Sequence, residues 1–376
     1  MSPDTRASRP TLRARRLRSA RDRFATGLIT AGGIGVLVAL LALGLFLLWE
    51  TLPLLRLGEL SVLAQLTPLA WGTLKAALFA LLFAVPVALG AAMYSAMFMS
   101  AHLRSRIKPV LELMEAVPGV VIGFIAGLVL APWVERHLVS ALGVAIWLPC
   151  SVLLLAFVWY RLPPGWRRRL PLSGAGLWLV AWLAAMLALA LWAAPLLASF
   201  LGVEDLRFWL DQRWGIDYAT RNAMIVGVAM GFAVIPGLYA LAEDALADVP
   251  AHLMEGAQAL GATRWQALWK VAIAAAGPGL FSAVMISAGR AVGETMIVLM
   301  ASGNTALLSA SPFEGMRSMA AAIAIELPEA APGGVTYHLL ILAALLLFVF
   351  TFLVNTLAEV VRQRLRRRYR RLEGRP

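Results

Sequence analysis

Long apolar stretches alternate with short polar segments along the whole chain. A run of about 20 apolar residues is long enough to cross the hydrocarbon core of a bilayer as a helix. The pattern therefore predicts an all-α polytopic membrane protein with about eight transmembrane helices. The predicted spans are 24–49, 69–99, 108–131, 141–160, 174–200, 220–241, 278–302 and 336–360.

The composition agrees with a membrane protein and excludes a soluble enzyme. Of the 376 residues, 61% are hydrophobic and 14% are charged, and the mean hydropathy is +0.79, well outside the range of soluble domains. The single cysteine, Cys150, excludes an intramolecular disulfide, and the four histidines lack metal-ligand spacing, so we expect no metal site. The sequence G-x-x-x-x-G-K-[ST] is absent, so ATP hydrolysis would require another chain.

Positive charge gathers in two tails and predicts the orientation of the chain. The net charge is +12, and many arginines lie in the basic tails 1–23 and 361–376. Lysine and arginine are enriched in cytoplasmic segments, so we expect both termini in the cytoplasm of a bacterium, with the chain in the inner membrane. Contact with anionic lipid explains the charge without a nucleic-acid partner. The first span is too long for a signal peptide, so we expect a retained anchor over 24–49.

Arg290 and Glu294 are the most informative ionisable residues within the predicted spans. A charge at the bilayer centre costs roughly 2.5–3.5 kcal/mol and needs a partner, a wet cavity or a charged substrate. In a continuous helix the two side chains would face each other at a spacing of four residues. Arg290 would then lie about 18 Å into a core about 30 Å thick. Lys75 lies near a predicted helix end, where we expect it to snorkel to the interface.

The loop over 248–277, between the sixth and seventh spans, predicts two short helices separated by one turn. Pro250 suits a first helical turn, and Gly261 can adopt the left-handed conformation that ends a helix. Thr263 and Gln266 have the spacing of a capping box that starts the next helix. These residues alone are compatible with an amphipathic hairpin on the membrane surface or with a docking element.

The same loop resembles a known motif. Glu255-Gly-Ala-x-x-x-Gly261, followed by Val271-x-Ile273, is similar to the EAA loop of ABC importer permeases, whose short helix docks onto a cytoplasmic ATPase. Gly256 replaces the usual alanine, and Ala274 stands where proline is usual. The resemblance implies that the coupling residues are Glu255, Gly256, Ala257, Gly261, Ala262 and Thr263.

Two further segments narrow the resemblance. Residues 289–304 and 319–330 are similar to phosphate-specific transport permeases of the PstC type; in the PstA type, Gly-Glu-Thr is followed by Ala-Pro. Residues 107–121 resemble the third helix of that family, with Glu115 where a small residue is usual. The resemblance covers roughly 65–131 and 220–360. It implies a type I ABC importer permease fold with a six-helix core, in which 141–219 is an inserted helix pair with an outer loop.

The resemblance implies a permease subunit of an ATP-driven importer of inorganic phosphate that catalyses no bond cleavage itself. It needs no cofactor of its own, because ATP and Mg would be bound by the ATPase. The implied partners are a homologous PstA-type permease, two PstB-type ATPase subunits, a periplasmic phosphate-binding protein and membrane lipid. A guanidinium matches phosphate oxygens well, and a nearby carboxylate would keep binding weak enough for release. The candidate pathway residues are Arg290, Glu294, Ser287 and Thr295.

Several alternatives stay open at this point. Arg290 and Glu294 would equally form an inert ion pair that fixes packing, and Glu112 or Glu115 is a second candidate partner for the arginine. The substrate of the importer is alternatively another oxyanion, such as sulfate or molybdate. A chain that senses the transport state as a scaffold, without lining a path, would also carry the docking loop.

Overall fold

The computed structural model describes residues 12–56, 60–161, 175–200, 202–203 and 205–372. Within these ranges every regular element is a helix, and eight helices are long and apolar enough to cross a membrane. The predicted all-α polytopic class and the predicted number of spans are thereby confirmed. The tail ends 1–11 and 373–376, and the basic residues at 167–169, lie outside the described residues.

The described elements follow one another in this order: α1 (Leu12–Arg56), α2 (Leu60–Met97), α3 (Ala101–Glu115), α4 (Gly119–Ile125), η1 (Ala126–Leu130), α5 (Ala131–Arg136), α6 (Leu138–Arg161), α8 (Ala175–Phe200), α9 (Leu206–Trp214), α10 (Ala223–Ala247), α11 (Ala251–Ala259), α12 (Arg264–Ala267), η3 (Leu268–Ala272), α13 (Ile273–Gly293), α14 (Met296–Ala301), α15 (Met319–Glu326) and α16 (Val335–Leu372).

The centre of the molecule is the packing of α2 against α10. Small residues allow two membrane helices to approach closely, which replaces the hydrophobic driving force that lipid cannot supply. On α10, Gly227 and Gly231 lie four residues apart and face Phe79 and Phe83 of α2. The α2 side of the contact consists of buried alanines at four-residue spacing, namely Ala76, Ala80, Ala84, Ala88 and Ala92.

Replacing Gly231 with valine is expected to destabilise this contact by about 1–3 kcal/mol, the usual range for overpacking a tight interior. A Cβ at this position would lie 2.7 Å from Cδ1 of Phe83 and 3.0 Å from the carbonyl oxygen of Ala80. The measurement is the thermal unfolding midpoint of the purified protein in mild detergent. Gly90→Val is the matched control, because nothing lies within 4 Å of a Cβ there. Equal midpoints for the two variants would contradict this account of the packing.

The third predicted span, 108–131, is not one helix. α3 ends at Glu115 and α4 begins at Gly119 after Pro118, whose backbone is extended with ψ 131°. A proline disfavours helical conformation in the residue before it, so the helix is interrupted there rather than kinked. The structure instead gives a candidate span over Gly119–Arg136, which includes the π-helical turn η1. The prediction of a continuous helix at this point was wrong.

The seventh predicted span, 278–302, is also interrupted. α13 ends at Gly293, Glu294 is extended with φ −69° and ψ 123°, and α14 begins at Met296. The membrane-spanning stretch begins earlier than predicted, at Arg264, and ends at Gly293. Hydropathy averaged over a long window does not reveal this end, because Glu294 and Thr295 after Gly293 are only two polar residues among many apolar ones.

The broken segments cross each other closely. A Cβ at Gly123 of α4 would lie 2.9 Å from the carbonyl oxygen of Met296, and Gly127 faces the backbone of Met300 in the same way. Glycine is required at such approaches because any side chain would occupy the space of the partner backbone. The crossing of α4 and α14 therefore brings the end of α13 beside the end of α3.

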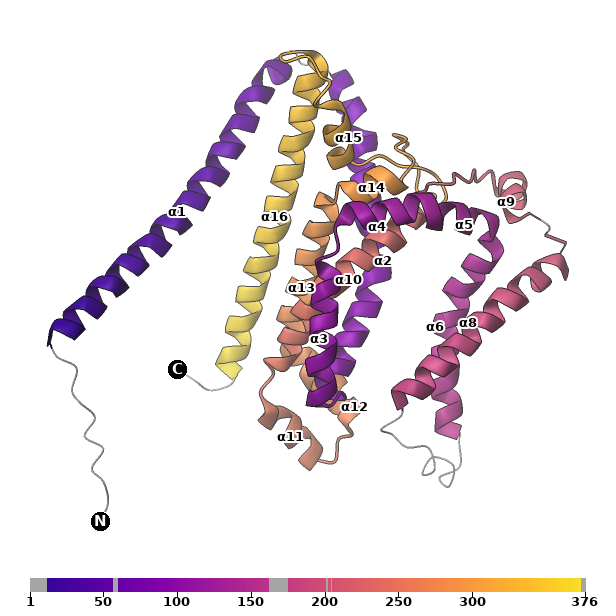
Figure 1. Cartoon of the computed structure of the whole chain (residues 1–376), viewed down its shortest axis with the longest axis horizontal. Helices are drawn as coiled ribbons and strands as arrows, with labels where there is room; N and C mark the ends of the chain where they lie inside the picture. The colour runs from indigo at the N-terminus through magenta and orange to yellow at the C-terminus, as the bar shows by residue number, and fades with distance from the viewer. Residues whose placement is uncertain (1–11, 57–59, 162–174, 201, 204, 373–376) are drawn as a thin grey trace.

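The helices α6 and α8 pack on each other at one end of the molecule, opposite α1 (Figure 1). Trp182 donates a hydrogen bond from Nε1 to the carbonyl oxygen of Ser151 at 3.1 Å. Only 6% of the most apolar stretch of each helix is buried, so the rest of their apolar surface is available to lipid. Their origin as an inserted pair stays a prediction.

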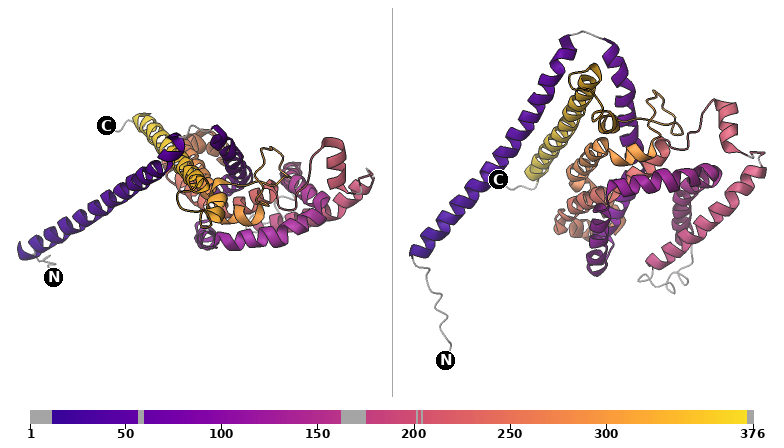
Figure 2. Two further views of the ribbon diagram at one scale, coloured as in Figure 1. Left: turned by 90° about the horizontal axis from the view of Figure 1, so that it is seen from above. Right: turned by 45° about the horizontal axis from the view of Figure 1, so that its top comes forward.

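The two terminal helices, α1 and α16, have their outer ends on the same side of the molecule as the loop over 248–277, which we call the docking loop. In Figure 1, the beginning of α1, the end of α16 and the helices α11 and α12 all lie at the lower side, and the view from above in Figure 2 shows α1 extending away from the bundle. This common side is what the predicted orientation requires.

Lys75 does not snorkel, contrary to the prediction. The residue is 4% exposed, and its Nζ is buried without a hydrogen-bond partner among the described residues. It lies on α2 between Leu74, which is 50% exposed, and the buried Ala76 of the α2–α10 contact. The predicted position near a helix end was also wrong, because α2 begins at Leu60 and its apolar span at Ala64, well before Lys75. The sequence also does not reveal which face of α2 is covered by protein.

Candidate functional site

Arg290 forms an ion pair with Glu115, and the two residues come from the ends of α13 and α3. The guanidinium Nη1 donates to Oε1 of Glu115. A Cβ on Gly237 of α10 would lie 3.1 Å from both of these atoms. A glycine at this position therefore leaves the space in which the two side chains meet.

The ion pair lies near the middle of a membrane-spanning helix. Gly237 is the contact point on α10, which runs over Ala223–Ala247. At 1.5 Å per residue, Gly237 lies about 21 Å from the first residue of α10 and about 15 Å from the last. The depth predicted for Arg290 was counted along 278–302, whereas the structure gives the span as Arg264–Gly293, so that count was wrong. Arg290 lies three residues before the end of its own span, and its side chain meets α10 near the middle of that helix.

A small cavity of about 50 Å³ opens beside the pair, enough for several water molecules. Three of its lining residues are charged, namely Arg290, Glu115 and Glu294, and the others are apolar or glycine. Glu294 reaches it from the break between α13 and α14; its Oε1 lies 2.9 Å from where a Cβ on Gly119 would be. Discontinuous helices that bring polar groups to the bilayer midplane are a recurrent way to build a substrate site.

The pairing of Arg290 with Glu294 within one helix was wrong. The helix ends between them, and the arginine instead pairs with Glu115, which was the alternative partner. Glu112, the other alternative, is exposed one turn earlier on α3 and does not line the cavity. An extra charge on the third predicted span was the sequence signal that pointed to Glu115.

Ser287 and Thr295 are not among the residues that line the cavity. Ser287 is 4% exposed and lies on the buried face of α13. Thr295 donates from Oγ1 to the carbonyl oxygen of Gly293 at 3.3 Å, within the break itself. Their part in a substrate pathway therefore stays a prediction that this cavity does not support.

The docking loop has the predicted local structure. α11 begins directly after Pro250, and Gly261 adopts φ +89° at the turn. Thr263 closes the capping box: its Oγ1 accepts from the amide of Gln266 at 3.2 Å, and its own amide donates to Oε1 of Gln266 at 2.9 Å. The second short helix, however, continues through η3 into the membrane helix α13, so the loop is mechanically continuous with the helix that carries Arg290.

α11 is largely exposed. None of its residues is buried, although Met254 packs partly against the core, and Leu260 at the following turn is 91% exposed. Glu255, Gly256 and Ala257 lie on this helix, and Ala262 follows the turn. An exposed helix with an apolar tip fits the docking alternative and the membrane-surface alternative equally well.

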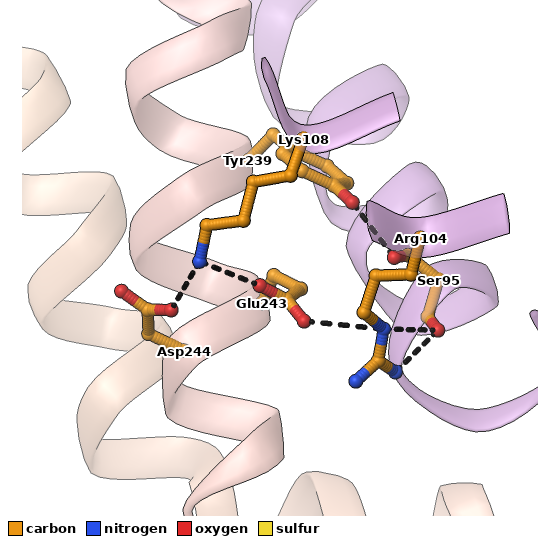
Figure 3. A network of polar contacts seen from close by, with 6 residues as sticks. All are labelled: Ser95, Arg104, Lys108, Tyr239, Glu243 and Asp244. Atoms are coloured by element: carbon orange, nitrogen blue, oxygen red, sulfur yellow. Dashed lines mark hydrogen bonds and ion pairs between the residues drawn. The ribbon is translucent and has the colours of Figure 1, made fainter. Parts of the chain in front are cut away.

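A network of charges ties α3 to α10 next to this loop (Figure 3). The carboxylate of Glu243, 4% exposed, lies 3.5 Å from Nε of Arg104 and 3.5 Å from Nζ of Lys108. Lys108 also reaches Asp244 at 3.2 Å, and this hydrogen bond raises the pKa of Lys108. We call these four residues the α3–α10 clamp.

Three further hydrogen bonds join Ser95 of α2 to α3 and α10. Arg104 donates from Nε and Nη2 to the carbonyl oxygen of Ser95 at 3.2 Å and 2.5 Å, and Tyr239 of α10 donates to Oγ of Ser95 at 2.7 Å. The clamp lies just before the end of α10, while Glu115 lies at the far end of α3, about 10–17 Å away along that helix. One rigid helix thus connects the loop end of the bundle with the ion pair.

The clamp was not predicted from the sequence. Lys108 was expected at the start of a span, and no role was predicted for Glu243 or Asp244, because charges near a predicted helix end are ordinarily solvated. The sequence signal for the clamp is Glu243, a carboxylate that directly follows a long apolar run.

An ion pair near the middle of α10, a cavity at two broken helices and an exposed loop at one end are features expected of a membrane permease. A sequence model of the family described as binding-protein-dependent transport system inner membrane component matches residues 88–367. The chain belongs to this family, because the match covers far more than half of its length. It is a multi-pass membrane component of a transport system that depends on a binding protein.

Curated relatives refine the comparison. The probable ABC transporter permease protein YqgH of Bacillus subtilis is 34% identical over 146 residues, which are 39% of this chain and 47% of that protein. The phosphate transport system permease protein PstC of Haemophilus influenzae is 38% identical over 135 residues, 36% of this chain and 42% of that protein. These alignments thus span less than half of the relatives. The PstC of Xylella fastidiosa (strain Temecula1) is 28% identical over 368 residues, 94% of each chain.

A solved structure of the MetNI methionine ABC transporter in inward-facing conformations also aligns with the chain. The TM-score is 0.42 at 14% identity, over 81% of this chain and 99% of that one.

Proposed function

We propose that this chain is the PstC-type permease subunit of an ATP-driven importer of inorganic phosphate and forms part of the translocation pathway. The observation that carries the proposal is Arg290, a permanently charged side chain that is 46% exposed at the level of the middle of α10. A charge exposed at this depth is strongly disfavoured against lipid. The exposed face is therefore covered by another chain or by water in a transport path.

The chemistry of the cavity fits an oxyanion. A guanidinium presents several donors in a plane that matches the oxygens of phosphate. In the structure, the carboxylate of Glu115 accepts a hydrogen bond from this guanidinium. A substrate oxyanion would replace that carboxylate, and Glu115 would return to Arg290 after release, so binding would stay reversible.

Phosphate is favoured over sulfate or molybdate by the comparisons. The relative from Xylella fastidiosa, which aligns over 94% of this chain, is named as a phosphate transport permease. The relative from Haemophilus influenzae carries the same name.

The proposed assembly follows from the loop and the exposed face. One of two PstB-type ATPase subunits, which bind ATP and Mg, would contact the coupling residues. These are Glu255, Gly256, Ala257, Gly261, Ala262 and Thr263. A PstA-type permease would cover the face that exposes Arg290, and a periplasmic phosphate-binding protein would deliver the substrate. Both termini would lie in the cytoplasm, as supported by their basic tails and by the common side of α1, α16 and α11 in Figure 1.

The test is purification of the complex in mild detergent, followed by reconstitution with the binding protein in vesicles. We expect a second permease and an ATPase to co-purify, and ATP-dependent uptake of labelled phosphate that persists in a tenfold excess of sulfate or molybdate, about 1.4 kcal/mol of discrimination. Uptake of labelled sulfate or molybdate in place of phosphate would assign the chain to another oxyanion. Absence of an ATPase from the purified complex would contradict the assembly.

A further inference from the structure

The cavity beside Arg290 contains more negative than positive charge, which is unexpected for the path of an anion. Its charged lining residues are one arginine and two glutamates, and no lysine, serine or threonine is among the residues that line it. An anion without a proton would meet one guanidinium and two carboxylates there. One carboxylate is enough to neutralise the arginine, so the second is expected to have another function.

The two glutamates have different surroundings. Glu115 accepts a hydrogen bond from Arg290. Glu294 is partly exposed, and among the residues that the structure describes no ion pair or hydrogen bond joins its carboxylate to another side chain. Its Oε1 lies beside Gly119, where the glycine leaves room for it. Glu294 thus presents a free acceptor to the cavity in which Arg290 presents donors.

Oxyanions differ in whether they can use such an acceptor. At neutral pH inorganic phosphate carries at least one P–OH group, whereas sulfate and molybdate carry no proton. A P–OH group can donate a strong, charge-assisted hydrogen bond to a carboxylate. An oxyanion without a proton would place its oxygen against that carboxylate with nothing between them, which is repulsive.

We infer that Glu294 is the specificity-determining residue of the pathway: it accepts a hydrogen bond from the P–OH group of phosphate while Arg290 donates to the other oxygens, and it repels fully deprotonated oxyanions. This inference rests on the proposed function. Glu115 has a different role, since it holds Arg290 when the cavity contains no substrate.

The expected discrimination is large but below that of an enclosed site. A site built to hydrogen-bond a hydroxyl group rejects an analogue without it by about 10⁴–10⁵-fold. Arg290 and Glu115 are 46% and 41% exposed, so water would screen part of the repulsion. We expect Glu294 to contribute about 10–100-fold to the preference for phosphate over sulfate.

The experiment measures binding directly, because the binding protein would impose its own selectivity on an uptake assay. Phosphorus NMR records the broadening of the inorganic phosphate signal by the purified complex, and sulfate is added as the competitor at constant ionic strength. The variants are Glu294→Gln, in which the amide can donate to any oxyanion, and Glu112→Gln as the matched control on the exposed face of α3.

In the wild type and in Glu112→Gln, we expect sulfate to leave the broadening unchanged at equal concentration. In Glu294→Gln, we expect equal sulfate to remove about half of the broadening or more, because the two anions would then compete on similar terms. If sulfate leaves the broadening unchanged in Glu294→Gln as well, the inference about Glu294 is overturned, while the proposed function in phosphate import is unaffected. A wild-type complex that imports phosphate yet gives no broadening would overturn the location of the site.

Discussion

Replacing Arg290 with glutamine is expected to lower ATP-dependent phosphate uptake by about 100-fold or more. Each hydrogen bond from the guanidinium to the charged substrate contributes about 1.5–3 kcal/mol, and each 1.4 kcal/mol is a factor of ten. The loss of two such bonds therefore gives about 100-fold or more. Glutamine keeps some hydrogen-bonding capacity but loses the charge and the fork of donors. The measurement is the initial rate of labelled phosphate uptake by reconstituted vesicles that contain equal amounts of assembled complex.

Two companion variants separate transport from folding. Arg290→Lys keeps the charge without the planar fork, so we expect uptake between those of the wild type and Arg290→Gln. In the variant with both Arg290→Gln and Glu115→Gln, neither charge is left unpaired, so assembly should be restored while uptake stays low. Wild-type uptake by Arg290→Gln in an assembled complex would show that the ion pair only fixes packing, and would favour a scaffold that senses the transport state.

Hydropathy predicted the fold class and the number of spans, because both depend on averages over long stretches. It did not locate the interruptions at Pro118 and Gly293, since a break inside an apolar run leaves the average unchanged. These two breaks place Glu294 and Glu115 in the lining of one cavity with Arg290. The functional geometry is thus decided at single residues that a window of about 20 residues cannot resolve.

The site residues were predictable only in part. Arg290 was identified because an ionisable residue within a span is costly. Its partner was not, because the choice between Glu115 and Glu294 depends on how α3 lies against α13 through the space above Gly237. The docking loop was predicted in detail, since capping and left-handed turns are local and need no knowledge of distant contacts.

Replacing Glu243 with glutamine is expected to lower the free energy of unfolding by about 1–3 kcal/mol and to reduce the phosphate imported per ATP hydrolysed. Removing one partner of a fully buried pair costs about 3–5 kcal/mol, but Arg104 and Lys108 are 30% and 40% exposed and regain hydration, so the cost is smaller. The measurements are the thermal unfolding midpoint in detergent and the ratio of uptake to ATPase activity in vesicles.

Asp244→Asn is the matched control, because this carboxylate is 65% exposed and its contact with Lys108 is a surface pair worth about 1 kcal/mol or less. The uptake ratio separates a coupling role from a purely structural one. α3 connects the clamp to Glu115, and α10 enters the docking loop directly after the clamp. A loosened clamp would therefore let the loop move without shifting the ion pair, so ATP would be hydrolysed with less transport. If Glu243→Gln lowers the midpoint but leaves the ratio unchanged, the clamp holds the bundle together and the movement reaches Arg290 through α13 alone.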